Sequence, residues 1–254
     1  ETAEFADVIL PATSFFEKTG TYTNTDRRVQ IGKKALDPPG QARLDWEVVS
    51  QIAGRMGYPM KYRSAEEIFN EFTALAPSYQ GLTYQNLEPH GKLWPCPEPE
   101  RSDGIQLLFG DGFPTPSGRG KFVPCEYRPA AEVPDPEYPL VLNTGRLLEH
   151  WHTGVMTRRS HALATIQPEA FCEMNADDLA AAGIQAGAYV TVSSRRGAIT
   201  LRAHASRRIA PGSVFIPFHF REAAANALTN DALDPVGKIP EFKFCAVRVE
   251  KARG

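Results

Sequence analysis

The segment from Asn143 to Ser160 carries the densest set of side chains that could do chemistry in this sequence. It holds two glycines, two histidines, three threonines and three arginines, and it follows an apolar run at 138–142 that predicts a strand. Backbone N–H groups, hydroxyls and positive charge on one loop suit a bound phosphate. Arg146 is the expected ion-pairing group, because a guanidinium binds phosphate bidentately and keeps its proton. The pattern indicates a loop that binds a phosphate-bearing cofactor.

The histidines and Thr153 in this loop admit several roles. His152 and Thr153 can hydrogen-bond to phosphate or to a ring heteroatom, and the alternative is a loop that caps itself with its own threonines and histidines. His150 fits a structural histidine equally well. A metal site at His150 and His152 is not expected, because the one nearby carboxylate, Glu149, would point to the opposite side of a strand.

A second candidate cluster combines aromatic rings with polar groups near the end of the chain. Aromatic rings beside a lysine and an asparagine can enclose a flat heterocycle and bind its edge. Packing of the aromatic rings in the core is the alternative, and the two interpretations are compatible. The cluster consists of Phe218, His219, Asn226, Phe242 and Lys243.

A third candidate is the polar stretch from Glu17 to Gln30, within a predicted loop over 13–30 that follows a predicted strand near 8–10. Ligands in α/β sheets usually bind past the carboxyl ends of strands, and Gly20 would allow a close backbone approach. Composition alone favours an ordinary surface loop. Arginine pairs occur at 27–28, 158–159, 195–196 and 207–208, and the last two are expected to be solvated at turns.

Several function classes are disfavoured. The formal charge of −2 gives no reason to expect nucleic acid or an anionic membrane as a partner, and no apolar run is long enough to span a bilayer. The sequence has no G-x-S-x-G, G-x-G-x-x-G or P-loop motif, although a nucleophile–His–acid triad is not excluded by spacing. The four cysteines form no C-x-x-C pair, which predicts reduced and mostly buried thiols. The segment therefore fits a cofactor binder better than the bearer of the chemistry.

Residues 1–60 are expected to form the end of an α/β domain. Apolar residues at four-residue spacing predict a helix over 45–56 that ends at Gly57. A capping box from Ser64 to Glu67 predicts a second helix. Proline-rich residues 61–137 are otherwise expected to be an irregular connector, with a short hairpin pairing 106–109 with 120–124. Because the chain opens at Glu1 in the middle of a pattern, we expect it to be part of something longer.

Residues 138–254 are expected to form a compact and mostly β domain. Asn175 and Gly183 frame a short helix, and alternating residues predict strands over 189–192 and 198–203 that are joined at 195–197. Further strands are expected at 213–218 and 243–249. Short strands with one helix predict a small closed barrel.

Several segments, in this order, resemble the molybdopterin-dependent formate dehydrogenases. Residues 6–12, 17–20, 27–30 and 45–46 are similar to the end of the large molybdopterin domain, and 55–60 and 94–96 to formate dehydrogenases in particular. Residues 143–159 and 240–249 resemble the C-terminal cofactor-binding domain. The resemblance implies an α/β fragment followed by a mostly-β domain, a double-psi β-barrel.

The resemblance also implies a cofactor and its contacts. The cofactor is bis-(molybdopterin guanine dinucleotide) carrying Mo or W, at which formate is oxidised to CO2. By position, the contacts are Arg146, Leu147, Leu148, His152, Thr153, Phe218, Phe242 and Lys243, with His219 and Asn226 as weaker carry-overs. Leu147 and Leu148 would act through backbone groups. The cysteine or selenocysteine that ligates the metal and the iron–sulfur cysteines are absent here, so no catalytic or metal-ligating residue is assigned and this segment alone is expected to be inactive.

The expected partners are the missing N-terminal part of the same subunit, electron-transfer subunits and the substrate formate, in the cytoplasm. Nitrate reductase is an alternative, because nitrate reductases share this architecture. A third possibility is a module that holds the cofactor without chemistry. A metal-ligating cysteine upstream would discriminate between the enzymes and this module.

Overall fold

The computed structural model describes residues 2–100 and 103–252, and the chain divides into two compact units, 1–123 and 124–254. Each unit is considered by itself. Within the described residues, none of the helices is both long and apolar enough to cross a bilayer.

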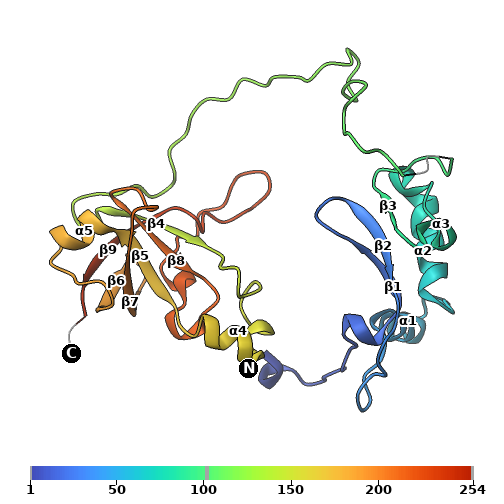
Figure 1. Cartoon of the computed structure of the whole chain (residues 1–254), viewed down its shortest axis with the longest axis horizontal. Helices are drawn as coiled ribbons and strands as arrows, with labels where there is room; N and C mark the ends of the chain where they lie inside the picture. Colours follow the sequence, from blue (N-terminus) through green and yellow to red (C-terminus); the bar gives the residue numbers. More distant parts are fainter. Residues whose placement is uncertain (1, 101–102, 253–254) are drawn as a thin grey trace. The chain divides into compact units, whose positions relative to one another are not determined.

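The first unit combines a small antiparallel sheet with helices (Figure 1). Five buried apolar residues of this unit form one cluster: Val29, Phe69, Leu82, Leu87 and Cys96. The sheet has the order β1 (Gly20–Thr23), β2 (Arg28–Gly32), β3 (Lys92–Leu93). The helices are α1 (Asp45–Arg55), α2 (Ala65–Leu75) and α3 (Tyr84–Leu87), with 3₁₀ turns at Thr2–Phe5, Phe15–Glu17 and Pro77–Tyr79.

Two expectations for the start of the chain are wrong. Residues 8–10 form no strand, and their side chains are more than half exposed. Most of the predicted loop over 13–30 lies in the β1–β2 hairpin, which extends to Gly32 and in which Gly20 pairs with Gly32. Asn24 organises the turn, because its side-chain oxygen accepts from the Arg28 N–H at 2.9 Å and its own N–H donates to the Arg28 carbonyl. Turn chemistry therefore produced a hairpin where the polar composition indicated a loop.

The two predicted helices are confirmed, with one difference in capping. Helix α1 ends before Gly57, which has φ +87°. At the start of α2, the Ser64 hydroxyl accepts from the Glu67 N–H at 3.2 Å. The Glu67 carboxylate does not return to Ser64, as a capping box requires, but accepts from the Arg63 N–H and guanidinium. The Glu67 carboxylate therefore binds Arg63 in place of the Ser64 N–H.

The connector of the first unit is held by Arg27 and forms no hairpin. The Arg27 guanidinium donates to the carbonyls of Trp94, Ile105 and Gln106. The predicted pairing of 106–109 with 120–124 is wrong, because no strand forms there. A tight turn in which the Phe113 N–H donates to Gly118 takes its place.

The second unit is a closed barrel with the strand order β4-β8-β5-β7-β6-β9 (Figure 1). Two strand pairs are parallel, β4–β8 and β5–β7, and the other pairs are antiparallel. This topology confirms the predicted double-psi β-barrel. The strands are β4 (Leu140–Gly145), β5 (Phe171–Asn175), β6 (Tyr189–Ser193), β7 (Ala198–Ser206), β8 (Ser213–Pro217) and β9 (Cys245–Lys251).

Short helices connect the barrel strands. Asn175 caps α5 (Ala176–Ala181) as predicted, by accepting from the Asp177 N–H at 2.9 Å. Strand β5 and helix α4 (His161–Ile166) had not been predicted from the sequence. The 3₁₀ turns lie at Thr157–Arg159, Arg221–Ala223 and Ala225–Ala227.

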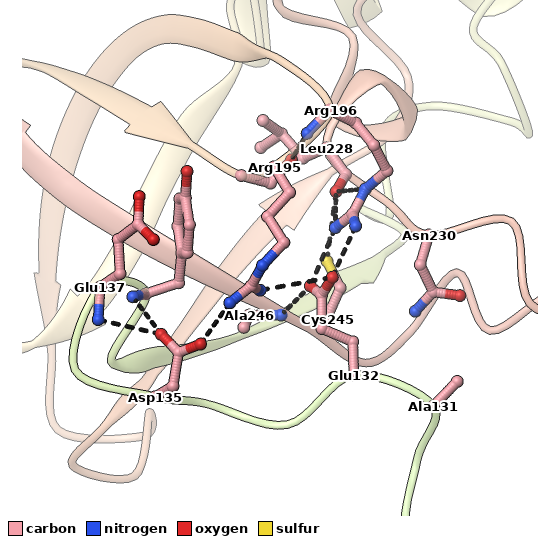
Figure 2. A network of polar contacts seen from close by, with 12 residues as sticks. Ala131, Glu132, Asp135, Glu137, Arg195, Arg196, Leu228, Asn230, Cys245 and Ala246 are labelled. Atoms are coloured by element: carbon pink, nitrogen blue, oxygen red, sulfur yellow. Dashed lines mark hydrogen bonds and ion pairs between the residues drawn. The ribbon is translucent and has the colours of Figure 1, made fainter.

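An ion-pair network ties the segment before the barrel to the β6–β7 turn (Figure 2). Arg196 forms two hydrogen bonds to the Glu132 carboxylate, at 2.6 and 2.9 Å, and Arg195 pairs with Asp135. Glu132 also accepts from the Ala246 N–H at 2.7 Å. The expectation that Arg195 and Arg196 are merely solvated is therefore wrong, because acidic residues some sixty positions earlier fold back onto them.

Candidate functional site

The parallel pairing of β4 and β8 brings together the two candidate segments of the barrel unit. Gly145 lies opposite Pro217 in the register, so both strands end at the same edge. The 146–159 loop and the 218–222 segment therefore start side by side, joined by the Phe218 N–H to the Gly145 carbonyl at 3.2 Å. Strand β4 extends to Gly145, so the loop begins three residues later than the sequence indicated.

Close packing at the end of β4 requires a small residue and fixes a third segment. A Cβ on Gly145 would lie 2.5 Å from Cε2 of Phe215. Next to it, the buried Thr144 hydroxyl donates to the Phe242 carbonyl at 2.5 Å. The backbone before β9 is therefore held against the end of β4.

Arg146 lies at the start of the loop with its guanidinium carbon 5.7 Å from the centre of the Phe218 ring. Among the described residues, no carboxylate lies within ion-pairing distance of it. Arg158, in the same loop, differs: it pairs with Glu222 at 2.5 Å and lies over the Phe220 ring. Among the described residues, Arg146 therefore has no carboxylate partner, whereas Arg158 is paired with Glu222.

His219 is fully buried and uses both ring nitrogens. Its Nε2 accepts from the Leu147 N–H at 2.8 Å, and its Nδ1 donates to the His152 carbonyl. An N–H can only donate and a carbonyl can only accept, so the ring is the neutral Nδ1–H form. Burial lowers the pKa of His219 below its ordinary value, which favours the same form.

His150 is the second buried histidine of the loop. Its Nε2 donates to the Gln167 carbonyl at 2.7 Å, and its Nδ1 accepts from the Thr157 hydroxyl at 3.3 Å. This ring is a structural histidine, one of the two interpretations that the sequence left open. The described residues contain no group of three or more His, Cys, Asp or Glu side chains placed to hold a metal ion.

The remaining predicted site residues divide into two groups. His152, with φ +52°, has its ring 6.0 Å from Phe218, and Leu148 and Thr153 are exposed on the same loop. These residues join Arg146, Leu147 and His219 in one region. Asn226 and Lys243 are exposed, and in the part of the chain that the structure describes no hydrogen bond, ion pair or ring contact links them to Arg146 or Phe218.

Contacts that had not been predicted from the sequence hold the loop against the segment after β8. Gly154 is buried with φ +75°, and a Cβ there would lie 2.8 Å from the His219 carbonyl oxygen. The Arg158–Glu222 pair adds a second connection between loop and segment. The glycine and the arginine were visible as residue types, but Glu222 lies 64 residues from Arg158 and had no local signal.

Two family models match the chain. Residues 140–246 match the model described as "Molydopterin dinucleotide binding domain", and residues 1–55 match "Molybdopterin oxidoreductase". The chain is 49% identical over 253 residues to the F420-dependent formate dehydrogenase subunit alpha of Methanocaldococcus jannaschii, with 99% of this chain and 37% of that protein covered.

Other relatives include both formate and nitrate enzymes. The chain is 39% identical to formate dehydrogenase H of Escherichia coli, with 98% of the chain and 35% of the relative covered. It is also 39% identical to the assimilatory nitrate reductase catalytic subunit of Bacillus subtilis, with 98% and 36% covered. The chain thus spans little more than a third of the length of these relatives.

Among solved structures, acetylene hydratase from Pelobacter acetylenicus has a similar fold. The TM-score is 0.74 at 19% identity, and 99% of this chain and 39% of that chain are covered. At this identity the likeness establishes the fold alone.

Proposed function

The chain belongs to the molybdopterin oxidoreductases and contains their dinucleotide-binding domain, and from this premise we propose that it serves as the C-terminal, cofactor-holding portion of a formate dehydrogenase. The identity of 49% to a formate dehydrogenase alpha subunit over 99% of the chain, against 39% to a nitrate reductase over 98%, supports formate as the substrate. Nitrate reductase remains the second candidate, because formate dehydrogenase H is also only 39% identical.

The observation that carries the assignment to the barrel is the uncommitted charge of Arg146. A buried or half-buried pyrophosphate needs cationic or N–H partners. Arg146 lies over Phe218 at the shared edge of β4 and β8, and no carboxylate of the described chain neutralises it. We propose that Arg146 binds the phosphates and that Phe218 and His152 lie against the nucleotide.

The other proposed contacts depend on which groups are still free. The Leu147 N–H is committed to His219, which leaves the Leu147 carbonyl for a ligand. Leu148 is 98% exposed, so we propose that its backbone makes the contact. Thr153 would offer its hydroxyl. Lys243, which is exposed and follows Phe242, would supply a second positive charge. No contact in the described part of the chain brings Asn226 to Arg146 or Phe218, so its side chain would have to extend further to reach the same ligand.

The cofactor would be a bis-(molybdopterin guanine dinucleotide) with Mo or W, which supplies the two-electron redox chemistry when bound. This chain's residues would bind the dinucleotide tail and exclude water from it. We propose that an N-terminal part of the same subunit supplies the metal ligand and an iron–sulfur cluster, that electron-transfer subunits accept the electrons, and that the enzyme works in the cytoplasm.

The binding proposal is tested by Arg146→Ala in the complete polypeptide that carries this segment, produced in a host that makes the cofactor. We expect metal and pterin content per polypeptide to fall by about tenfold or more, because an ionic hydrogen bond to phosphate is lost. Arg146→Lys should retain part of the content. Arg159→Ala, which removes an exposed arginine of the same loop, is the matched control and should keep it. Full occupancy in Arg146→Ala would refute the assignment.

The substrate is tested separately on the loaded wild-type protein. We expect formate-dependent reduction of an artificial dye and no dye oxidation by nitrate. The reverse result would assign the nitrate reductase function, and inactivity with both substrates at full occupancy would favour a binding module.

A further inference from the structure

The fully buried His219 lies between the two ends of the loop that carries Arg146. Its Nε2 accepts from Leu147, directly after Arg146, and its Nδ1 donates to the His152 carbonyl. One ring therefore ties residues 147 and 152 to the end of β8. With both nitrogens engaged and no exposed surface, His219 has no atom available to a ligand.

The surrounding contacts show that the loop depends on this ring. The loop backbone also approaches the His219 carbonyl at Gly154, where a side chain would leave no room. The ring centres of His150 and Phe220 lie 5.8 and 6.3 Å from that of His219 and 5.3 Å from each other, so the three rings form one cluster. The Arg158–Glu222 pair closes the far end of the loop. Between residues 147 and 152, the His219 ring holds the Leu147 N–H and the His152 carbonyl, while the Trp151 N–H donates to the Thr157 hydroxyl at 3.0 Å and the Trp151 carbonyl accepts from the Gly154 N–H.

We propose that His219 is a positioning residue: in its neutral Nδ1–H form it holds Leu147 and His152 so that Arg146 points at the dinucleotide. This inference rests on the proposed function of the loop. It changes the role that the resemblance implied, because His219 would act through the loop and would not touch the cofactor.

The proposal has a consequence for pH. A protonated ring carries N–H on both nitrogens, so its Nε2 can no longer accept from Leu147. The charged and titratable groups that face the ring are Arg146, His150 and His152, and the guanidinium of Arg146 opposes a further positive charge on it. Burial lowers the pKa of His219 below its ordinary 6.5, so the loop should be fully held above pH 6.5 and should loosen as the pH falls through that lowered pKa.

The test uses hydrogen exchange of the complete polypeptide, with and without cofactor. In His219→Ala, we expect the amide of Leu147 to exchange about tenfold faster, as for the loss of one hydrogen bond of ordinary strength. The cofactor should dissociate faster in the same variant. His219→Gln places an amide oxygen near the position of Nε2 and should restore slow exchange at Leu147.

The pH profile separates positioning from a merely structural role. In the wild type, protection of Leu147, corrected for the intrinsic rate of exchange, should fall below pH 6.5, and this step should vanish in His219→Gln. His150→Gln, which alters the neighbouring ring, is the matched control and should keep the step.

The outcomes are distinct. Unchanged exchange at Leu147 in His219→Ala would overturn the proposal, and so would loss of cofactor with unchanged exchange, which would mean direct contact. Faster exchange with undiminished cofactor binding would overturn the proposed function of the loop and leave the contacts of His219 confirmed. Arg146→Ala tests that function independently.

Discussion

The two units of the chain differ in how completely they bury their own apolar side chains. The barrel core includes residues of all six strands, with Leu142, Val214 and Ile216 fully buried. The first unit has one small buried cluster, and large apolar side chains such as Phe5 and Met56 are 90% and 80% exposed. The barrel core is built from residues of this chain, whereas in the first unit apolar side chains of α1 and of the N-terminal segment are exposed.

This difference matters for where function can be assigned. A closed barrel has no free sheet edge, and its rigid strands fix the loops that leave them. The Arg146 loop is therefore defined by contacts within its own unit. In the first unit, the open faces match the finding that the chain spans 37% of its M. jannaschii relative. We expect residues outside this chain to be needed there.

The largest expected effect compares two isoleucines. Ile216 in β8 is fully buried and Ile52 in α1 is 46% exposed. Ile216→Ala should destabilise the barrel unit by about 2–5 kcal/mol, because it leaves a cavity. Ile52→Ala should change the stability of the first unit by no more than about 1 kcal/mol. Both stability losses are measured by denaturant unfolding, with hydrogen exchange in peptides of each unit as the readout. Equal losses would show that the two cores are equally self-sufficient.

A second pair compares two glycines with left-handed backbone. Gly57 has φ +87° with open space around it, so Gly57→Ala should cost about 1–2 kcal/mol from backbone strain alone. Gly154→Ala adds contact with the His219 carbonyl and should cost more. We also expect Gly154→Ala to lower cofactor content. If thermal unfolding showed the same loss for both variants, the loop would not be clamped as described.

A third pair compares two carboxylates that bind arginine. The hydrogen bond from Arg196 lowers the pKa of Glu132 below its ordinary 4.5, so the stabilisation is present above that pH and is lost as the pH falls through the lowered pKa. Glu132→Gln should cost about 1–3 kcal/mol at neutral pH and flatten the acid limb. Glu67→Gln, in the exposed Arg63 pair, should cost less. Acid unfolding monitored by hydrogen exchange in peptides of each unit distinguishes the two variants. A steeper loss of stability with falling pH in Glu132→Gln than in the wild type would contradict the expected direction.

The smallest effect is expected for two exposed leucines. Leu148 is 98% and Leu75 77% exposed, so alanine at either position should change stability by at most about 0.5 kcal/mol. Leu148→Ala should also keep its cofactor, because the proposed contact uses the backbone. Loss of metal and pterin in this variant would mean that the side chain itself binds.

Periodic and capped elements could be predicted because their signals are local. Helices α1 and α5 and strands β6 and β7 follow from apolar spacing and from Asn175 and Gly183. Strand β5 was missed, and the 8–10 strand was predicted wrongly. Short apolar runs carry little information on whether a partner strand is available. The region of Arg146 and Phe218 could be proposed from residue types, and its assembly could not.

The sequence by itself determined where five of the six barrel strands run, all except β5, and which residues offered charge and hydrogen bonds. Only the tertiary structure decided which of those groups remained free. His219 is engaged by Leu147, 72 residues earlier, Arg158 by Glu222 and Arg196 by Glu132, whereas Arg146 faces no carboxylate of the described chain. The physical reason is that a hydrogen bond or ion pair depends on distance in space, and for partners this far apart the barrel closure sets that distance.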